Sequence, residues 1–222
     1  ACFGFDYMKR KEAGKQYIDV GIAEQNLITM ASALAKGGCK PIVITESSFY
    51  QRAYDQIEQE LCINRCPATL LVAFSGIYAH NDDTHIGFFD ISLLGNIPRL
   101  IYLAPSNKQQ YLAMLEWSIE QNKFPVAIRI PWNGVHYTDE QVLKDYSKSK
   151  YSVKRAGKKV ALIGLGSFFQ LAENVSNLLF KETGICSTLI DPIFISDCDE
   201  KTLNGLVKDH SLVVTLEDGI IS

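Results

Sequence analysis

Short apolar runs alternate with amphipathic stretches along the first part of the chain. The runs rich in β-branched residues predict strands at 17–20, 41–45, 68–74, 100–104 and 126–130. The stretches with apolar residues three and four positions apart predict helices at 24–36, 48–62, 87–95 and 107–121. Strands that alternate with helices predict an α/β fold, in which a parallel sheet is covered by helices on both faces.

A polar stretch without periodicity divides the chain into two parts. Residues 135–157 are rich in Lys, Asp, Ser and Tyr, and we interpret them as a linker. This predicts a first domain at residues 1–134 and a second α/β domain at residues 158–222. The second domain has strand patterns at 159–164, 187–190 and 212–216 and a helix pattern at 168–180.

A glycine pair follows the first strand predicted for the second domain. Gly164-Leu165-Gly166 looks like the start of a dinucleotide-binding fingerprint, but the third glycine is missing because the chain has Phe169 there. We therefore interpret this segment as a tight turn between a strand and a helix.

Composition and charge narrow the range of functions. The chain has 222 residues, of which 47% are hydrophobic and 21% charged, as in ordinary globular proteins. The net charge of −3, without a basic stripe, argues against nucleic acid as a partner. No apolar run reaches the roughly 18–20 residues of a membrane-spanning helix. The six cysteines form no CxxC pair, so we expect reduced thiols and a cytoplasmic protein.

One carboxyl group stands out at the junction of the first predicted strand and helix. The junction reads Tyr17-Ile18-Asp19-Val20-Gly21-Ile22-Ala23-Glu24-Gln25-Asn26, and Glu24 has mostly apolar neighbours. A poorly solvated carboxyl group holds or shares a proton more readily than an exposed one. The alternative is that Glu24 interacts with the free N–H groups at the start of the helix.

Further motifs follow this junction in order. They are Thr45-Glu46-Ser47-Ser48-Phe49-Tyr50-Gln51-Arg52-Ala53-Tyr54-Asp55-Gln56, Ser75-Gly76-Ile77, Thr84-His85-Ile86-Gly87 and Arg129-Ile130-Pro131-Trp132. Together they resemble the pyrimidine-binding domain of thiamine-diphosphate enzymes of the transketolase group, most closely that of 1-deoxy-D-xylulose 5-phosphate synthases. The resemblance covers about residues 15–134 and continues more weakly from about 158, where it implies a transketolase C-terminal-like domain that is incomplete.

The resemblance implies that thiamine diphosphate is the cofactor. It places Glu24 against the aminopyrimidine ring as a catalytic acid, which requires a carboxyl group in a water-poor pocket. It makes Phe49 the aromatic ring that stacks on the pyrimidine. Glu46 stands near the cofactor, at a position where the synthases usually have tyrosine. Without the resemblance, Phe49 alone would be interpreted as a core residue on a helix.

The resemblance also implies three residues that contact the substrate. Arg52 is expected to reach an anionic group, because its planar guanidinium matches phosphate and carboxylate. His85 is expected to move protons at the reacting carbonyl, since histidine titrates near neutral pH. Asn81 stands where the family has aspartate. The alternatives are a surface ion pair for Arg52 and a solvated loop position for His85.

The implied reaction is the transfer of a two-carbon unit from a keto substrate to an aldehyde, with pyruvate and glyceraldehyde 3-phosphate as the substrates of the synthases. Trp132 replaces a family arginine that binds substrate phosphate, which leaves the acceptor open. A transketolase C-terminal subunit is implied equally. The alternatives are a β-type subunit of a 2-oxo-acid dehydrogenase E1 component and a non-catalytic dimerisation scaffold of the same fold.

The resemblance further implies a partner. The family holds the diphosphate and Mg²⁺ through a Gly-Asp-Gly…Asn motif on a separate domain, and that motif does not occur in this chain. We therefore expect Mg²⁺ and the diphosphate to be bound by another domain or subunit. A homodimer is also expected, because the family's sites are shared between domains that often belong to two chains. Whether the chain is a fragment or a separate subunit stays open.

Overall fold

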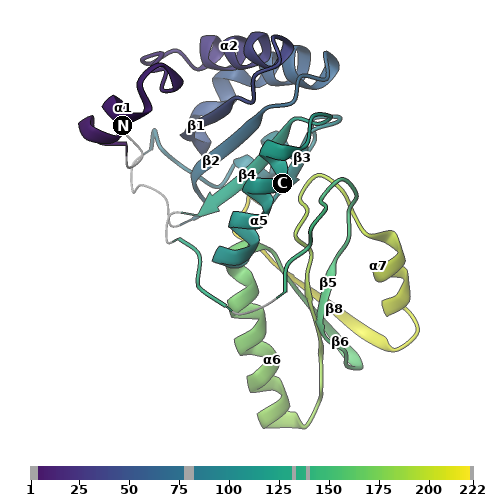
Figure 1. Cartoon of the computed structure of the whole chain (residues 1–222). Coiled ribbons are helices and arrows are strands. Elements are labelled where there is room, and N and C mark those ends of the chain that lie inside the picture. Colours follow the sequence, from purple (N-terminus) through teal and green to yellow (C-terminus); the bar gives the residue numbers. More distant parts are fainter. Residues whose placement is uncertain (1–4, 78–82, 132–133, 139–140, 221–222) are drawn as a thin grey trace.

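The computed structural model describes residues 5–77, 83–131, 134–138 and 141–220. Its first sheet contains β1 (Ile42–Glu46), β2 (Thr69–Ser75), β3 (Ile101–Leu103) and β4 (Val126–Pro131). These strands are ordered β1-β2-β4-β3, and every pairing is parallel (Figure 1). The parallel sheet expected from the apolar runs is therefore confirmed.

Both faces of this sheet are covered, because successive residues of β2 point into two different cores. Leu70 and Val72 belong to a core formed with α2 (Glu24–Lys36) and the segments that follow β1. Leu71 belongs to a second core that includes Met114 of α5 (Lys108–Glu120). A strand buried on both faces is apolar at nearly every position, which explains the sequence of β2.

The predicted helix at 48–62 is three helical segments of different geometry. They are a 3₁₀-helix, η2 (Ser47–Ala53), a single α-turn, α3 (Tyr54–Gln56), and a π-helix, η3 (Ile57–Ile63). The predicted helix at 87–95 is shorter than expected and corresponds to α4 (Asp90–Leu94). The side-chain pattern marks a buried face, but it does not distinguish between helices of different winding.

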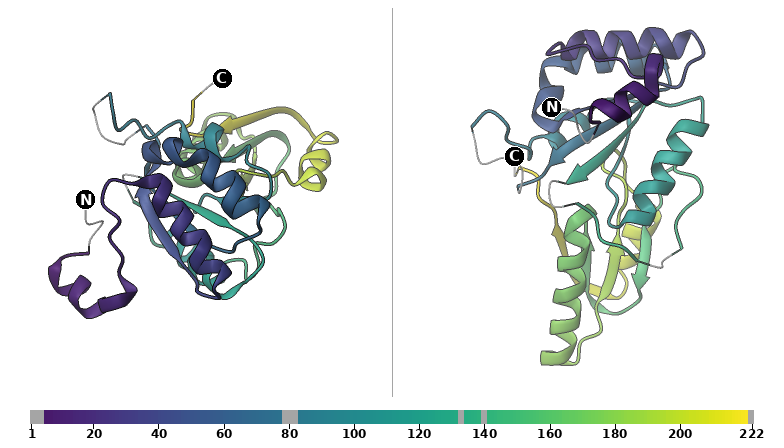
Figure 2. Two further views of the ribbon diagram at one scale, coloured as in Figure 1. Left: turned by 90° about the horizontal axis from the view of Figure 1, so that it is seen from above. Right: turned by 60° about the vertical axis from the view of Figure 1, so that its left-hand side comes forward.

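The strand predicted at 17–20 is wrong. The first described elements are α1 (Tyr7–Ala13) and η1 (Gly14–Gln16), and residues 17–20, which follow, have no regular secondary structure and lie outside both sheets. The N-terminal segment stands away from the body of the molecule in the left view of Figure 2. Ile18 is exposed, so this apolar residue marks an uncovered surface and not a strand core.

A second sheet contains β5 (Ser152–Arg155), β6 (Lys159–Gly164), β7 (Thr188–Asp191) and β8 (His210–Leu216), ordered β5-β7-β6-β8. Only β5 is antiparallel to its neighbour. The helices of this part are η4 (Gly166–Phe168), α6 (Phe169–Thr183) and α7 (Glu200–Leu206).

The segment predicted as a linker, residues 135–157, is partly incorporated into this fold. It contains β5, and Tyr146 is completely buried with its ring 5.6 Å from that of Trp117. Its polar composition and lack of periodicity indicate a linker, because they do not reveal the few apolar residues that pack into the fold. The domain boundaries at 134 and 158 remain predictions.

The turn after β6 is as tight as the sequence suggests. A Cβ atom at Gly164 would lie 2.7 Å from the Cα of Phe169, so only glycine fits where the strand meets the helix. Gly166 has a φ of +55° and begins η4. This local geometry supports the interpretation of the glycine pair as a strand-to-helix turn.

Polar contacts of a buried carboxyl group join the two sheets. Asp191, at the end of β7, accepts hydrogen bonds of 2.7 Å from the hydroxyl of Ser106 and the amide of Gln110. Complete burial raises the pKa of Asp191 despite these bonds, because desolvation disfavours the carboxylate.

Within the described residues, no helix is both long and apolar enough to cross a membrane.

Candidate functional site

The candidate residues gather where the first sheet's strands end. Glu46 is the last residue of β1 and is buried, and η2 begins directly after it. β2 ends at Ser75, and the loop that carries His85 follows. Open parallel sheets bind ligands in the crevice outside the carboxyl ends of their strands, so these residues occupy the expected position.

Glu24 is the first residue of α2 and is only 7% exposed. Its Oε2 atom has no aligned hydrogen-bond partner among the described residues. This Oε2 atom lies 3.3 Å from Nη1 of Arg52, and the side chain of Arg52 is 51% exposed. Within the described part of the chain, this buried carboxyl group thus has a half-exposed arginine as its ion-pair partner.

Phe49 and Arg52 both lie on η2, three positions apart. Side chains at this spacing eclipse one another on a 3₁₀-helix, so the two share a face. Arg52 reaches Glu24, and the Phe49 ring lies 5.2 Å from the ring of His85 at an angle of 66°. One turn of η2 therefore brings the acid, the arginine, the aromatic ring and the histidine together.

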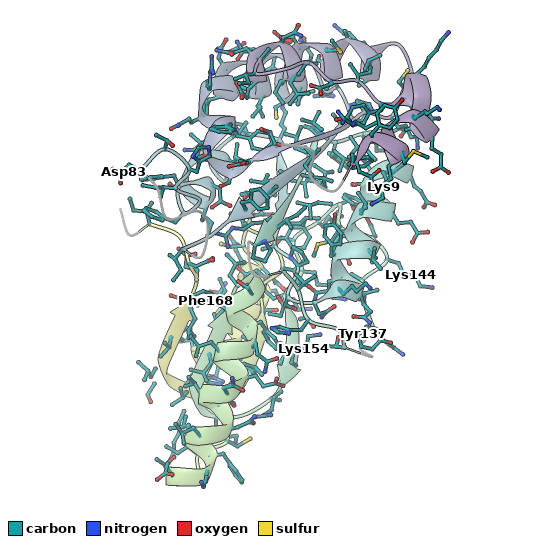
Figure 3. All side chains as sticks on the ribbon, turned by 90° about the vertical axis from the view of Figure 1, so that its left-hand side faces the viewer. Lys9, Asp83, Tyr137, Lys144, Lys154 and Phe168 are labelled. Carbon is teal, nitrogen blue, oxygen red and sulfur yellow. The ribbon has the colours of Figure 1, made fainter. Side chains whose placement is uncertain are left out.

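The loop around His85 lies at the periphery of the molecule. The imidazole Nδ1 of His85 is 2.7 Å from the hydroxyl of Thr84. Asp83, two residues earlier, projects at the outer edge of the molecule (Figure 3). The candidate residue Asn81 and the substituted position Trp132 lie outside the described residues.

A buried charge network next to this site was not predicted. Arg129 of β4 is 2% exposed and donates two hydrogen bonds to Asp90, of 2.7 Å from Nε and 3.2 Å from Nη2. Its Nη1 donates to Asp218, which follows β8, and Tyr102 donates its hydroxyl to Asp90. Burial alone disfavours the charged guanidinium, but the two carboxylates outweigh this effect and raise the pKa of Arg129.

The sequence carries one signal of this network. Arg129 interrupts the otherwise apolar run Val126-Ala127-Ile128-Arg129-Ile130, and a charge inside a buried strand requires a partner. Its partners could not be identified, because they lie 39 and 89 positions away along the chain.

The fold and the site define a class of protein: an α/β protein with a parallel sheet, in which a buried acid contacts an arginine that shares a helical turn with an aromatic ring. The chain matches the family model for the transketolase pyrimidine binding domain over residues 5–135 and that for the transketolase C-terminal domain over residues 149–222. The chain belongs to the transketolase family, which confirms the resemblance inferred from the motifs.

The similar proteins include 1-deoxy-D-xylulose-5-phosphate synthases. Those of Lachnoclostridium phytofermentans and Clostridium acetobutylicum are 38% and 35% identical over 92% and 95% of this chain. The chain spans only 32% and 34% of the length of these relatives. A solved split-gene transketolase, described as an inactive beta4 tetramer, matches with a TM-score of 0.82 and 22% identity, covering 98% of this chain and 69% of that one.

Proposed function

We propose that this chain forms the pyrimidine-binding part of a thiamine-diphosphate-dependent transferase that passes a two-carbon unit from a keto substrate to an aldehyde. The observation that carries the proposal is the buried Glu24 carboxyl group, with Phe49 and His85 positioned by the adjacent η2. The similarity to 1-deoxy-D-xylulose-5-phosphate synthases supports pyruvate and glyceraldehyde 3-phosphate as the substrates to test first.

The residues present fit the pyrimidine end of the cofactor. Oε2 of Glu24 is buried without an aligned hydrogen bond among the described residues, so it can bind a ring nitrogen without breaking one. Phe49 is half-buried and offers a flat apolar surface, and Glu46 lies buried at the end of β1. When bound, thiamine diphosphate supplies the carbon nucleophile that two-carbon transfer requires.

We assign a chemical role to each of Glu24, Arg52 and His85. Glu24 would share its proton with the ring, because a carboxyl group shielded from water is suited to proton transfer. The side chain of Arg52 is half-exposed and can turn from Glu24 toward an anionic substrate group, whose geometry its planar guanidinium matches. His85, in contact with Phe49, would move a proton at the reacting carbonyl.

The site also supports a partner domain. Ile22, next to the Glu24 turn, is 89% exposed, and Ile77 and Phe89 on either side of the His85 loop are exposed as well. Large apolar side chains grouped around a polar site are typical of a surface that another protein covers. We propose that a diphosphate-binding domain or subunit covers this surface and supplies the contacts to the diphosphate and Mg²⁺, in an assembly built on a homodimer.

No group of three or more His, Cys, Asp or Glu side chains in the described part of the chain is arranged to hold a metal ion. The test therefore combines the chain with a candidate diphosphate-binding domain, thiamine diphosphate and Mg²⁺. Calorimetry measures cofactor binding, and product formation from pyruvate and an aldehyde measures turnover.

In this assembly, Glu24→Gln keeps the shape of the side chain and removes the acid. We expect turnover to fall by about 10²- to 10⁴-fold, the range typical of general acid–base groups. The matched control is Glu116→Gln on the exposed surface of α5, which should leave turnover unchanged. A Glu24→Gln assembly with near wild-type turnover would disprove the role of Glu24, and no binding heat with any partner would favour a scaffold.

A further inference from the structure

The loop that carries His85 is closed at its base by backbone contacts. Gly76 donates its N–H to the carbonyl of Gly87 at 2.8 Å, and the two residues form an isolated antiparallel bridge. The hydroxyl of Ser47, the first residue of η2, lies 3.4 Å from the same carbonyl and 3.3 Å from that of Phe74. The base of the loop is thereby tied to the helix that presents Phe49 and Arg52.

The chain after β8 returns to this base from the second sheet. The side chain of Asp218 lies directly over Gly76, because a Cβ atom there would be 1.8 Å from its Oδ2 atom. Gly76 also has a φ of +93°, a backbone conformation that favours glycine. Two residues on, Ile220 donates its N–H to the carbonyl of Phe88 at 3.1 Å. The segment 217–220 thus contacts both ends of the loop.

Arg129 fixes Asp218 in this position. Its guanidinium donates two hydrogen bonds to Asp90 and a third to Asp218, and all three residues are almost completely buried. A planar guanidinium holds two carboxylates in a defined relative geometry. Since Asp90 begins α4, directly after the loop, one arginine aligns the end of the loop with the segment from the second sheet.

We infer that Asp218 is a positioning residue: with Arg129 it holds the base of the His85 loop, and through this loop the second sheet controls where His85 stands against Phe49. This assigns to the C-terminal part of the chain a role in the site that it does not reach directly. The importance of that role for turnover rests on the proposed function, whereas the mechanical coupling does not.

The structure provides a matched control. Asp191 is, like Asp218, a buried carboxylate that connects the second sheet to the first, but its partners are Ser106 and Gln110. Asp218→Asn and Asp191→Asn both remove one buried charge between the sheets. Only Asp218→Asn changes a group that touches the loop.

The test is amide hydrogen exchange of the chain, measured for peptides that contain Gly76 and Ile220. We expect Asp218→Asn to accelerate exchange at both amides by about tenfold or more, and Asp191→Asn by less than about threefold, because only the first contact supports these hydrogen bonds. If Asp218→Asn folds poorly, Gly76→Ala forces Asp218 away while keeping its charge; because it also strains the backbone at position 76, its effect is read at the Ile220 amide alone, where the same acceleration is expected. Equal acceleration in the two Asn variants, or none in Asp218→Asn and Gly76→Ala, would overturn the inference.

A second measurement links the loop to the site. In the active assembly described above, Asp218→Asn should lower kcat at least about tenfold while leaving the affinity for thiamine diphosphate within about twofold, since the pyrimidine contacts lie on α2 and η2. A loss confined to cofactor affinity would contradict positioning of His85. If the wild-type assembly is inactive, the proposed function fails, but the exchange experiment still decides the coupling.

Discussion

Removing the charge of Arg129 should be among the most damaging single changes to this fold. Arg129→Met keeps a long apolar side chain in β4 but leaves the buried carboxylates of Asp90 and Asp218 facing one another without a cation. A buried charge that loses its partner cannot recover its solvation without opening the structure.

The size of the effect follows from the contacts. Breaking a buried ion pair by removing one partner costs about 3–5 kcal/mol of unfolding free energy. The upper part of this range applies here, because one guanidinium serves two carboxylates through three hydrogen bonds. The remaining bond from Tyr102 to Asp90 compensates only in part. Against a typical total stability of about 5–15 kcal/mol, such a loss brings the fold close to unfolding.

Urea denaturation at neutral pH, followed by tryptophan fluorescence and circular dichroism, measures this loss. Arg65→Met is the control, because Arg65 is exposed and the loss of an exposed charge should change the unfolding free energy by about 0.5 kcal/mol or less. The triple change Arg129→Met, Asp90→Asn and Asp218→Asn should recover at least half of the loss by removing the unpaired charges. The reasoning is refuted if Arg129→Met costs no more than Arg65→Met, or if the triple variant is as unstable as the single one.

Two further predictions concern stability. Gly164→Ala should destabilise the second sheet by about 1–3 kcal/mol in urea unfolding, because the new Cβ would lie 2.7 Å from backbone that cannot rotate away. Gly205→Ala in α7 is the control: a Cβ there meets no atom within 4 Å, so this change should stabilise the fold by about 0.5–1 kcal/mol. Equal effects of the two changes would contradict this prediction. Burial raises the pKa of Asp191, so the folded state binds its proton more tightly than the unfolded state does. The stability of the wild type relative to Asp191→Asn should therefore fall as pH rises from about 4 through the raised pKa, and a pH-independent difference would exclude Asp191 as the titrating group.

The first sheet could be predicted because burial on both faces leaves a direct mark on the sequence. β2 reads Thr-Leu-Leu-Val-Ala-Phe-Ser, and only a strand between two helix layers tolerates so few polar residues. The same rule failed at residues 17–20, where apolar side chains lie outside both sheets and Ile18 is exposed. Apolar character marks a surface to be covered, but it does not say whether the covering group is this chain or another protein.

The candidate site was predicted residue by residue, and the structure adds how these residues meet. Sequence spacing placed Phe49 and Arg52 on one helical face, but only the 3₁₀ winding of η2 makes them eclipse, so that one contacts His85 and the other Glu24. The chemical roles assigned to these four residues, and to Glu46 and Asn81, stay predictions until the variants above are measured.

The charge network could not be predicted from the sequence, for a different physical reason. A motif is recognisable when its members act on one ligand at a fixed spacing, whereas Asp90, Arg129 and Asp218 act on one another across the two sheets. The position of Arg129 in an apolar strand indicates only that an anionic group is buried with it, and does not identify that group. Arg129 binds Asp90 beside the His85 loop and Asp218 after β8. Neither the loop nor the segment after β8 can therefore shift without leaving a buried charge without its partner. That constraint makes the C-terminal domain part of the site's architecture, although it supplies none of the groups proposed to touch cofactor or substrate.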